Sequence, residues 1–188
     1  MTELKKWKLV RSQLVLNHHW CQIRQDTIEL PNGTIIDDFF VNIRPDIALI
    51  FPVTPLGEIV FVRQYRHGIG EILLELPAGR FNPQEETAIS AASRELTEET
   101  GYVAEQLTLM ATFYDNPVKD TNHIHLFFAK NVKLIGKRQL DLTEDIEVVL
   151  VPIVKVKEKI FKGEICVSGT VAAIFLGLDL LSQIVSKQ

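Results

Sequence analysis

One stretch of the sequence, residues 87–100, constrains the chain more than any other, because it is helical in character and acidic on one side. It contains alanines, glutamates and a leucine but neither proline nor glycine, and Gly101 follows at the position where helices favour glycine. At about 100° per residue, Glu95, Glu98 and Glu99 spread over an arc of roughly 100°, so all three leave one face within a single turn. These carboxylates repel one another and are also opposed by the dipole at the helix C-terminus.

This acidic face has two interpretations. The first is a solvated helix surface with no further role. The second is a binding site for a hard divalent cation, whose oxygen ligands favour magnesium or manganese over zinc. The helix by itself leaves both open.

Most of the remaining sequence has the patterns typical of β-strands, with two helices near the C-terminal end. The predicted strands are residues 23–30, 34–41, 48–53, 58–64, 72–76, 107–113, 123–130 and 146–152. A turn at Pro31-Asn32-Gly33 separates the first two. A short helix ending near Gly163 and a longer one over residues 170–185 complete the pattern, which predicts an α/β (α+β) fold with a mixed sheet covered on both faces.

Composition limits the class of protein. A chain of 188 residues buries roughly 70% of its unfolded surface and needs no metal to hold its core, so a metal here is functional. The net charge of −4 and the pI of about 5.7 argue against a broad nucleic-acid-binding surface. Cys21 and Cys166 are far apart, which favours two reduced thiols in a cytoplasmic protein. We expect no export signal and no membrane span.

Residues 79–102, GRFNPQEETAISAASRELTEETGY, carry a longer spaced pattern. It resembles the Nudix box, G-x5-E-x7-R-E-U-x-E-E-x-G-U, where U is a bulky aliphatic residue. The residues in register are Glu86, Arg94, Glu95, Leu96, Glu98, Glu99 and Gly101. The sequence departs at Arg80, where the box has the glycine that stands here one residue early as Gly79, and at the aromatic Tyr102. Neither departure touches the acidic face.

The resemblance extends to a particular branch of the family. Residues 62–79 (VRQYRHGIGEILLELPAG) and 142–149 (LTEDIEVV) are similar to the ADP-ribose pyrophosphatase and nucleotide-sugar pyrophosphatase branch. That resemblance implies an α/β/α sandwich of Nudix type and a homodimer. Residues 1–44 are then an N-terminal antiparallel β segment that forms the dimer, and residues 45–188 are the Nudix hydrolase domain. In some members the N-terminal segment reaches the partner's site.

The resemblance also implies a reaction and its metal ligands. The family cleaves a pyrophosphate inside a nucleoside diphosphate linked to another moiety, with Mg²⁺ or Mn²⁺ as cofactor. Glu95 and Glu99 are expected to bind the cation, together with Glu98 and the carbonyl of Ala78. The cation neutralises charge on the phosphates and positions a water molecule.

Four further residues support this helix by the same resemblance. Arg94 is expected to orient the glutamates, although an exposed helix ion pair is the simpler alternative. Glu86 supports the loop near the metal or favours the helix N-terminus by its charge. Gly79 and Gly101 shape the loop before the helix and the helix end.

The resemblance to this branch implies a general base in the loop after the helix, among Glu144, Asp145 and Glu147. Glu144 precedes the predicted strand whereas Glu147 lies within it, so Glu144 is the candidate base. An acidic turn with no role is the alternative, since a base is established by geometry.

The resemblance also implies substrate contacts from Arg66, Glu75 and Pro117. Strand alternation places Arg63 and Arg66 on opposite faces, and Arg66 matches the family position. Glu75 contacts substrate or forms a structural ion pair. In ADP-ribose-hydrolysing relatives a proline follows the box by about fifteen residues, as Pro117 follows Tyr102 here, since 117 − 102 = 15.

The substrate and the class of protein keep alternatives. The loop reads Asn116-Pro117-Val118, where those relatives have Ser-Pro-Gly, and valine lacks the freedom of glycine. The spacing of Pro117 makes ADP-ribose the first candidate substrate. The departure at Val118 leaves GDP-mannose or another nucleotide sugar as the rival. A non-hydrolysing ADP-ribose sensor is the alternative of another class, but such modules lose glutamates that this box keeps.

Several other side chains invite a functional interpretation. His123 and His125 share a strand face, but a metal pair is not expected without further histidines nearby. Trp20, Phe39 and Phe40 are candidates for stacking on the base, with ordinary core packing as the simpler expectation.

Overall fold

The structure, a computed structural model, describes residues 4–141 and 144–185. The chain divides into two compact units, which we describe separately. The first contains the residues up to Pro45 together with Tyr114–Asn122, and the second contains Asp46–Phe113 together with the chain from His123 onward. The segment Tyr114–Asn122 joins the first unit through the backbone of Asn42, whose amide donates to the Lys119 carbonyl over 2.7 Å.

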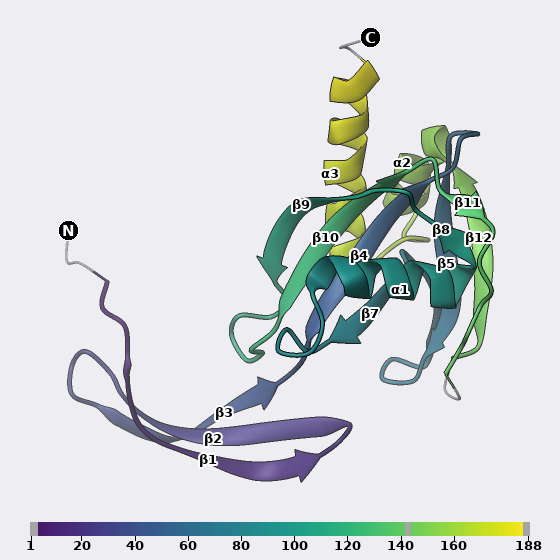
Figure 1. The fold of residues 1–188 in the computed structure, drawn as a ribbon. Helices are drawn as coiled ribbons and strands as arrows, with labels where there is room; N and C mark the ends of the chain where they lie inside the picture. Colours follow the sequence, from purple (N-terminus) through teal and green to yellow (C-terminus); the bar gives the residue numbers. More distant parts are fainter. Residues whose placement is uncertain (1–3, 142–143, 186–188) are drawn as a thin grey trace. The chain divides into compact units, whose positions relative to one another are not determined.

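The first unit is an antiparallel sheet of β1 (Lys8–His18), β2 (Cys21–Glu29) and β3 (Ile35–Ile43), in that order (Figure 1). The predicted turn joins β2 to β3, and Gly33 takes the positive φ of 83° that it requires. The sequence pattern missed β1. All residues of this strand are exposed, so no buried face imposes an apolar alternation on them.

The second unit is built on a mixed seven-stranded sheet with the order β12-β5-β4-β10-β9, in which β6 also pairs with β5 and β7 with β4. Its strands are β4 (Asp46–Val53), β5 (Glu58–Arg66), β6 (Glu71–Glu75), β7 (Ala78–Phe81), β9 (Leu107–Tyr114), β10 (His123–Lys130) and β12 (Ile146–Pro152). Two short strands, β8 (Tyr102–Val103) and β11 (Lys133–Leu134), pair with each other. Strand β10 runs parallel to β4, whereas β5 and β7 run antiparallel to it.

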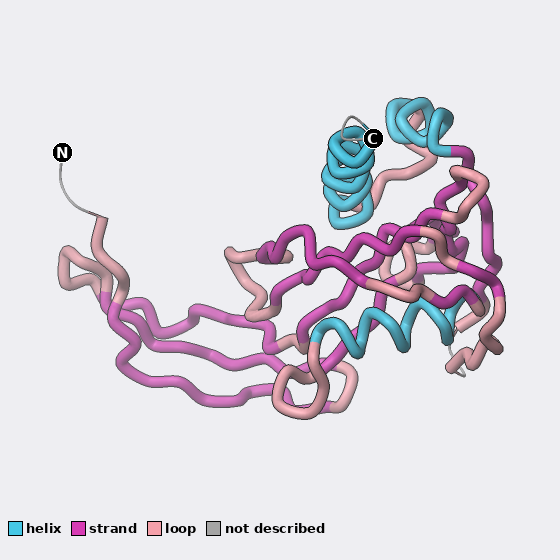
Figure 2. The backbone as a smooth tube through the Cα atoms, turned by 45° about the horizontal axis from the view of Figure 1, so that its top comes forward, coloured by secondary structure: helices cyan, strands magenta, loops and turns pink. Residues whose placement is uncertain are grey.

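Helices cover both faces of this sheet, as Figures 1 and 2 show. They are α1 (Ala88–Thr100), α2 (Ile153–Phe161) and α3 (Ser168–Val185). Ala91, Ala92 and Leu96 of α1 pack in one buried cluster, and residues of α2 and α3 pack in another. The mixed sheet between helical layers confirms the predicted fold class. None of the described helices is both long and apolar enough to cross a membrane.

The central strand β4 explains how the two layers meet. Its residues alternate between the two clusters: Ala48 and Ile50 face α1, and Leu49 and Phe51 face α2 and α3. A strand covered on both faces is a nearly continuous apolar run, as this one is from Ile47 to Val53. Helix α3 approaches closely at Gly177, where a β-carbon would stand 2.3 Å from the Phe51 ring.

Candidate active site

Helix α1 supplies the acidic cluster that the sequence predicts. It begins after Thr87, whose hydroxyl accepts a hydrogen bond from the Ser90 amide over 3.2 Å, and it ends at Gly101 with a φ of 75°. Glu95 and Glu99 are buried, with 8% and 3% of their surface exposed. The interpretation of this face as a solvated surface is therefore wrong for these two glutamates.

Glu99 lies at the end of the helix with almost no access to water. Its Oε2 accepts a hydrogen bond from the Ala78 amide over 3.1 Å, so the observed contact of Ala78 is its N–H. Burial raises the pKa of Glu99 to about 8, and the negative charge of Glu95 adds to the effect. A carboxyl group in this environment favours its neutral form at neutral pH.

Glu95 lies one turn earlier and against the backbone of β7. A β-carbon built on Gly79 would stand 1.8 Å from the Glu95 carboxyl carbon, so only glycine leaves room for this carboxylate. Burial raises the pKa of Glu95, and its contact with Arg94 opposes that rise. Gly79 therefore shapes the place in which the Glu95 carboxylate lies.

Arg94 connects the acidic groups to one another. Its guanidinium donates to Glu95 over 2.6 Å, to Glu98 over 3.1 Å, and to both oxygens of Glu86 over 3.2 and 2.9 Å. The hydrogen bonds with Glu86 are the main reason that the pKa of Arg94 is raised. An isolated helix ion pair would have one partner, whereas this fork has three, as expected of an orienting arginine.

Glu144 lies close to the buried glutamates. Its negative charge contributes to the raised pKa of both Glu95 and Glu99. Its carboxylate accepts a hydrogen bond from the Asp141 amide over 2.9 Å. Glu147 lies instead in β12 and forms an ion pair with Arg63.

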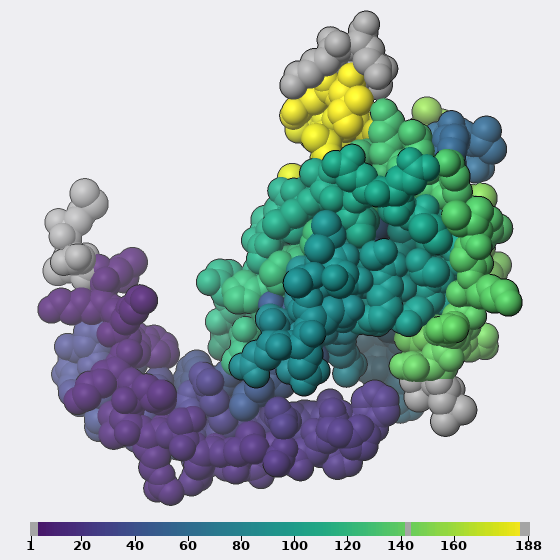
Figure 3. All heavy atoms as spheres, viewed as in Figure 1, coloured from purple at the N-terminus to yellow at the C-terminus, as the bar shows by residue number. Residues whose placement is uncertain are grey.

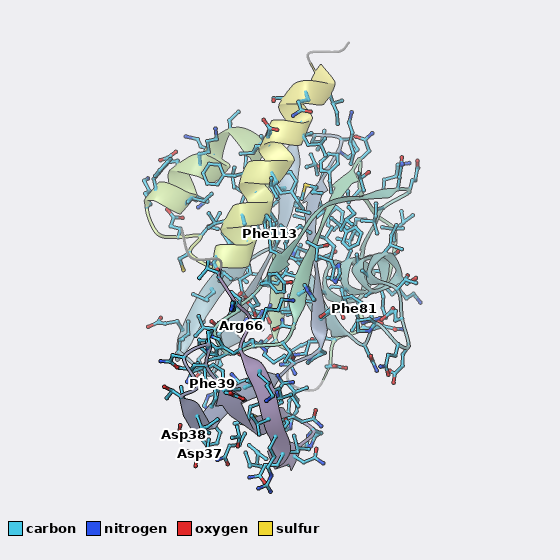
Figure 4. The ribbon with its side chains drawn as sticks, turned by 90° about the vertical axis from the view of Figure 1, so that its left-hand side faces the viewer. Asp37, Asp38, Phe39, Arg66, Phe81 and Phe113 are labelled. Carbon is cyan, nitrogen blue, oxygen red and sulfur yellow. The ribbon has the colours of Figure 1, made fainter. Side chains whose placement is uncertain are left out.

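Arg66 and Glu75 form the ion pair that the sequence left open. Arg66 ends β5 and is labelled in Figure 4; its Nε donates over 2.7 Å to Glu75, which is buried. The positive charge of Arg66 slightly opposes the raised pKa of Glu99, which places Arg66 near the acidic cluster. Arg63 lies on the other face of the strand, as alternation predicts.

Other candidates belong to the first unit. Pro117 is exposed and belongs to the segment Tyr114–Asn122 of the first unit. In the first unit Trp20 and Phe40 are exposed, so core packing is wrong for both, while Phe39 of β3, labelled in Figure 4, contacts Trp7 edge to face at 5.9 Å.

The two histidines of β10 surround a carboxylate in the second unit. Asp46 accepts hydrogen bonds from the His123 amide and from His125 Nε2, each over 2.9 Å. Burial alone would raise the pKa of Asp46, but these donors and the two imidazoles lower it. Sequence reasoning missed this role of Asp46, because β4 and β10 are far apart in the chain.

Arg138 also escaped the sequence analysis. Its Nε donates to the Glu99 carbonyl over 2.9 Å. The sequence contained only an indirect indication of this role. The last turn of α1 has no basic residue to oppose the helix dipole, so a basic residue from another part of the chain can take that place.

The acidic cluster fits a divalent cation by its chemistry. Its donors are carboxylate oxygens, which hard cations prefer, and the space left at Gly79 accommodates one of these carboxylates. Within residues 4–141 and 144–185 no three His, Cys, Asp or Glu side chains lie close enough together to bind a metal ion as they stand. Glu95 and Glu98 instead form ion pairs with Arg94.

Comparisons with known proteins agree with this geometry. Residues 43–165 match the NUDIX domain family, and residues 7–42 match the nucleoside diphosphate sugar hydrolase N-terminal domain. The ADP-ribose pyrophosphatase of Bacillus subtilis (strain 168) is 32% identical over 75% of this chain and 76% of its own length. The methanol dehydrogenase activator of Bacillus methanolicus is 29% identical over 93% of this chain and 94% of its own.

A solved structure shows the same fold. The crystal structure of an ADP compounds hydrolase superposes with a TM-score of 0.86, with 21% identity over 97% of this chain and 98% of that one. The NUDIX match spans the acidic helix, its preceding loop and Glu144. With more than half of its length in that match and a sequence relative above 30% identity, the chain belongs to the Nudix family of hydrolases.

Proposed function

We propose that this hydrolase cleaves the pyrophosphate bond of a nucleoside diphosphate linked to another moiety, with ADP-ribose as the first candidate substrate and AMP and ribose 5-phosphate as products. The observation that carries the proposal is the buried pair Glu95 and Glu99, with Glu144 close enough to raise the pKa of both. The similarity to an ADP-ribose pyrophosphatase over three quarters of each chain supports the substrate.

The residues of α1 have different proposed roles in the reaction. Glu95 and Glu99, with Glu98, would hold Mg²⁺ or Mn²⁺, which when bound supplies positive charge to the phosphates and makes a water molecule more acidic. Arg94 keeps Glu95 and Glu98 in fixed orientations through its hydrogen bonds. Without a cation the buried carboxyl groups repel one another, and protonation of Glu99 relieves that repulsion.

Glu144 is the proposed general base. Its carboxylate accepts a proton from the attacking water, whose oxygen forms the new bond to phosphorus while the bond from phosphorus to the bridging oxygen breaks. Arg66 is proposed to bind a phosphate or the distal ribose, oriented by its ion pair with buried Glu75. Arginine suits this role because its fork matches phosphate oxygens.

The loop that contains Pro117 bears on the identity of the substrate. Val118 stands where ADP-ribose-hydrolysing relatives have glycine, and its side chain is 70% exposed. The match of residues 7–42 to a domain of nucleoside diphosphate sugar hydrolases keeps GDP-mannose or another nucleotide sugar as the second candidate.

We further propose that the protein acts as a homodimer in the cytoplasm. The first unit exposes large apolar side chains along β1, including Leu9, Val10 and Leu14, each between 46% and 56% exposed, more than a stable monomer leaves uncovered on one strand. A second copy of the chain is the proposed cover. Cys21 and Cys166 are both exposed free thiols, which suits a reducing compartment.

A panel of nucleoside diphosphate sugars and dinucleotides, incubated with Mg²⁺ and analysed by mass, tests the activity. We expect AMP and ribose 5-phosphate from ADP-ribose, and turnover lower by orders of magnitude with the Glu99→Gln variant. Faster turnover of GDP-mannose would move the assignment to the second candidate. Binding of ADP-ribose without turnover of any panel member would favour a non-hydrolysing ADP-ribose sensor over a hydrolase.

A further inference from the structure

The loop segment 136–139, which follows β11, is attached to the C-terminal end of α1 by hydrogen bonds. The Gly136 amide donates to the Gly101 carbonyl over 2.9 Å, and the Gln139 amide donates to the Glu98 carbonyl over 3.0 Å. Arg138 Nε donates to the Glu99 carbonyl over 2.9 Å. These carbonyls belong to the end of the helix, where no amide of the helix itself can bind them.

Arg138 makes a second contact on the far side of the loop. Its Nη2 donates to the carbonyl of Ile146, the first residue of β12, two residues beyond Glu144. One guanidinium thus joins the carbonyl of a buried glutamate to the strand that follows the proposed base. A guanidinium suits this bridge because its donors point in fixed, different directions.

Charge favours the same arrangement. Glu95, Glu98 and Glu99 occupy the end of α1, and the last turn of the helix has no basic residue of its own. Arg138 brings a positive charge to this end from a distant part of the sequence, where it opposes both the helix dipole and the carboxylates. Figure 3 shows the teal surface of α1 beside the green surface of the loop and β12.

We infer that Arg138 is a positioning residue, which holds Glu144 in register with the buried glutamates of α1. This inference rests on the proposed function, because it concerns the distance between the base and the other acidic groups. Arg138 acts through Glu144 and not on the substrate. Its loss should therefore slow the chemical step and leave substrate binding nearly unchanged.

A double-mutant cycle with Glu144 tests this coupling. We expect Arg138→Ala to lower kcat by about 10- to 100-fold and to change KM by less than about 3-fold. In the Glu144→Gln background the same substitution should change kcat by less than about 3-fold, because the base that it positions is absent. An equal loss in both backgrounds, or an unchanged kcat in folded Arg138→Ala, would overturn the inference.

Lys137 provides the matched control. It is the exposed neighbour of Arg138, and no hydrogen bond or ion pair joins it to any residue that the structure describes. Lys137→Ala removes the same charge from the same loop, so kcat should stay within about 2-fold of the wild type. Arg138→Gln is a milder substitution for the cycle if Arg138→Ala fails to fold.

Amide hydrogen exchange gives a readout that needs no turnover. In Arg138→Gln the amides of Gly136 and Gln139 should exchange faster, whereas those of α3 should not change. Unchanged exchange at both amides would contradict the positioning role. If the wild type hydrolyses no panel substrate, the proposed function fails, and hydrogen exchange still decides whether Arg138 holds the loop.

Discussion

Two carboxylate sites in the second unit have opposite electrostatic properties. Asp46, at the start of β4, is surrounded by donors, and these lower its pKa although burial alone would raise it. Glu99, at the end of α1, is buried among other carboxylates, and its pKa rises to about 8. The protein itself satisfies the charge of Asp46, but it does not satisfy that of Glu99.

This difference separates a structural site from a functional one. A carboxylate whose partners are supplied by the fold stabilises the fold, and its charge is neutralised there. A carboxylate that is buried next to other carboxylates lowers the free energy of unfolding until a cation binds. The proposed function assigns the second property to α1, and substitutions at both sites can test the contrast.

The largest effect is expected from Glu99→Gln. The amide is close in shape but carries no charge for a cation, so turnover of the best panel substrate should fall by orders of magnitude while the fold persists. Steady-state kinetics in Mg²⁺ measure the loss, and circular dichroism checks the fold. Near wild-type turnover would remove Glu99 from the proposed metal site.

Gly79→Ala should displace the Glu95 carboxylate without breaking the fold. The new β-carbon would stand 1.8 Å from the carboxyl carbon, which lies at the flexible end of its side chain and can move. We expect kcat to fall by about 100-fold, since a shift of roughly 1 Å at an active site has such an effect.

Gly68 is the matched control for this substitution. A β-carbon there meets nothing within 4 Å, and so Gly68→Ala should keep the wild-type kcat. Equal rates for the two alanine variants would show that the position of the Glu95 carboxylate does not matter.

The free energy of unfolding of the cation-free protein should depend on pH through Glu99. Its pKa is about 8 in the folded chain against an ordinary 4.5, so the folded state keeps this proton longer. The stabilisation is complete below pH of about 4.5 and is lost as pH rises through about 8, with a slope approaching about 1.4 kcal/mol per pH unit.

Urea unfolding in a chelator between pH 5 and 8.5 measures this dependence. Glu99→Gln should lack this part of the slope, whereas Glu71→Gln, at an exposed position on β6, should follow the wild type. Parallel curves for wild type and Glu99→Gln would contradict the raised pKa.

The smallest effect is expected from Asp46→Asn. The amide oxygen can still accept from the His123 amide, but the charge that His125 contacts is lost, so the free energy of unfolding should fall by about 1–2 kcal/mol. Thermal unfolding measures the change, and kcat should remain within about 2-fold. A large loss of kcat at unchanged stability would place Asp46 in the reaction.

The sequence predicted the second unit better than the first, for a physical reason. Residues 48–53 and 59–62 are apolar and buried beneath the helices, and runs of apolar residues can be recognised in a sequence. Strand β1 has no buried residue and leaves no such signal. The short strand β7 was also missed. It follows Pro77 directly, and it forms by pairing with β4, which lies far from it in the sequence.

For the candidate site, the spacing within α1 predicted which glutamates lie together but not how deeply they are buried. That depth depends on the backbone of β7 at Gly79 and on the Ala78 amide, which contacts within the helix cannot reveal. The roles of Asp46 and Arg138 were likewise hidden, because their partners lie far along the sequence. The assigned roles of Glu144, Arg66 and Pro117 stay predictions.

The parallel pairing of β4 with β10 also affects the order in which the chain can fold during synthesis. The sheet of β1, β2 and β3 joins neighbours in sequence and can form early. Strand β4 leaves the ribosome soon afterwards, yet its parallel neighbour is complete only at Lys130. During that interval one edge of the most apolar strand is unpaired, so slower translation before residue 130 should increase the demand for chaperones.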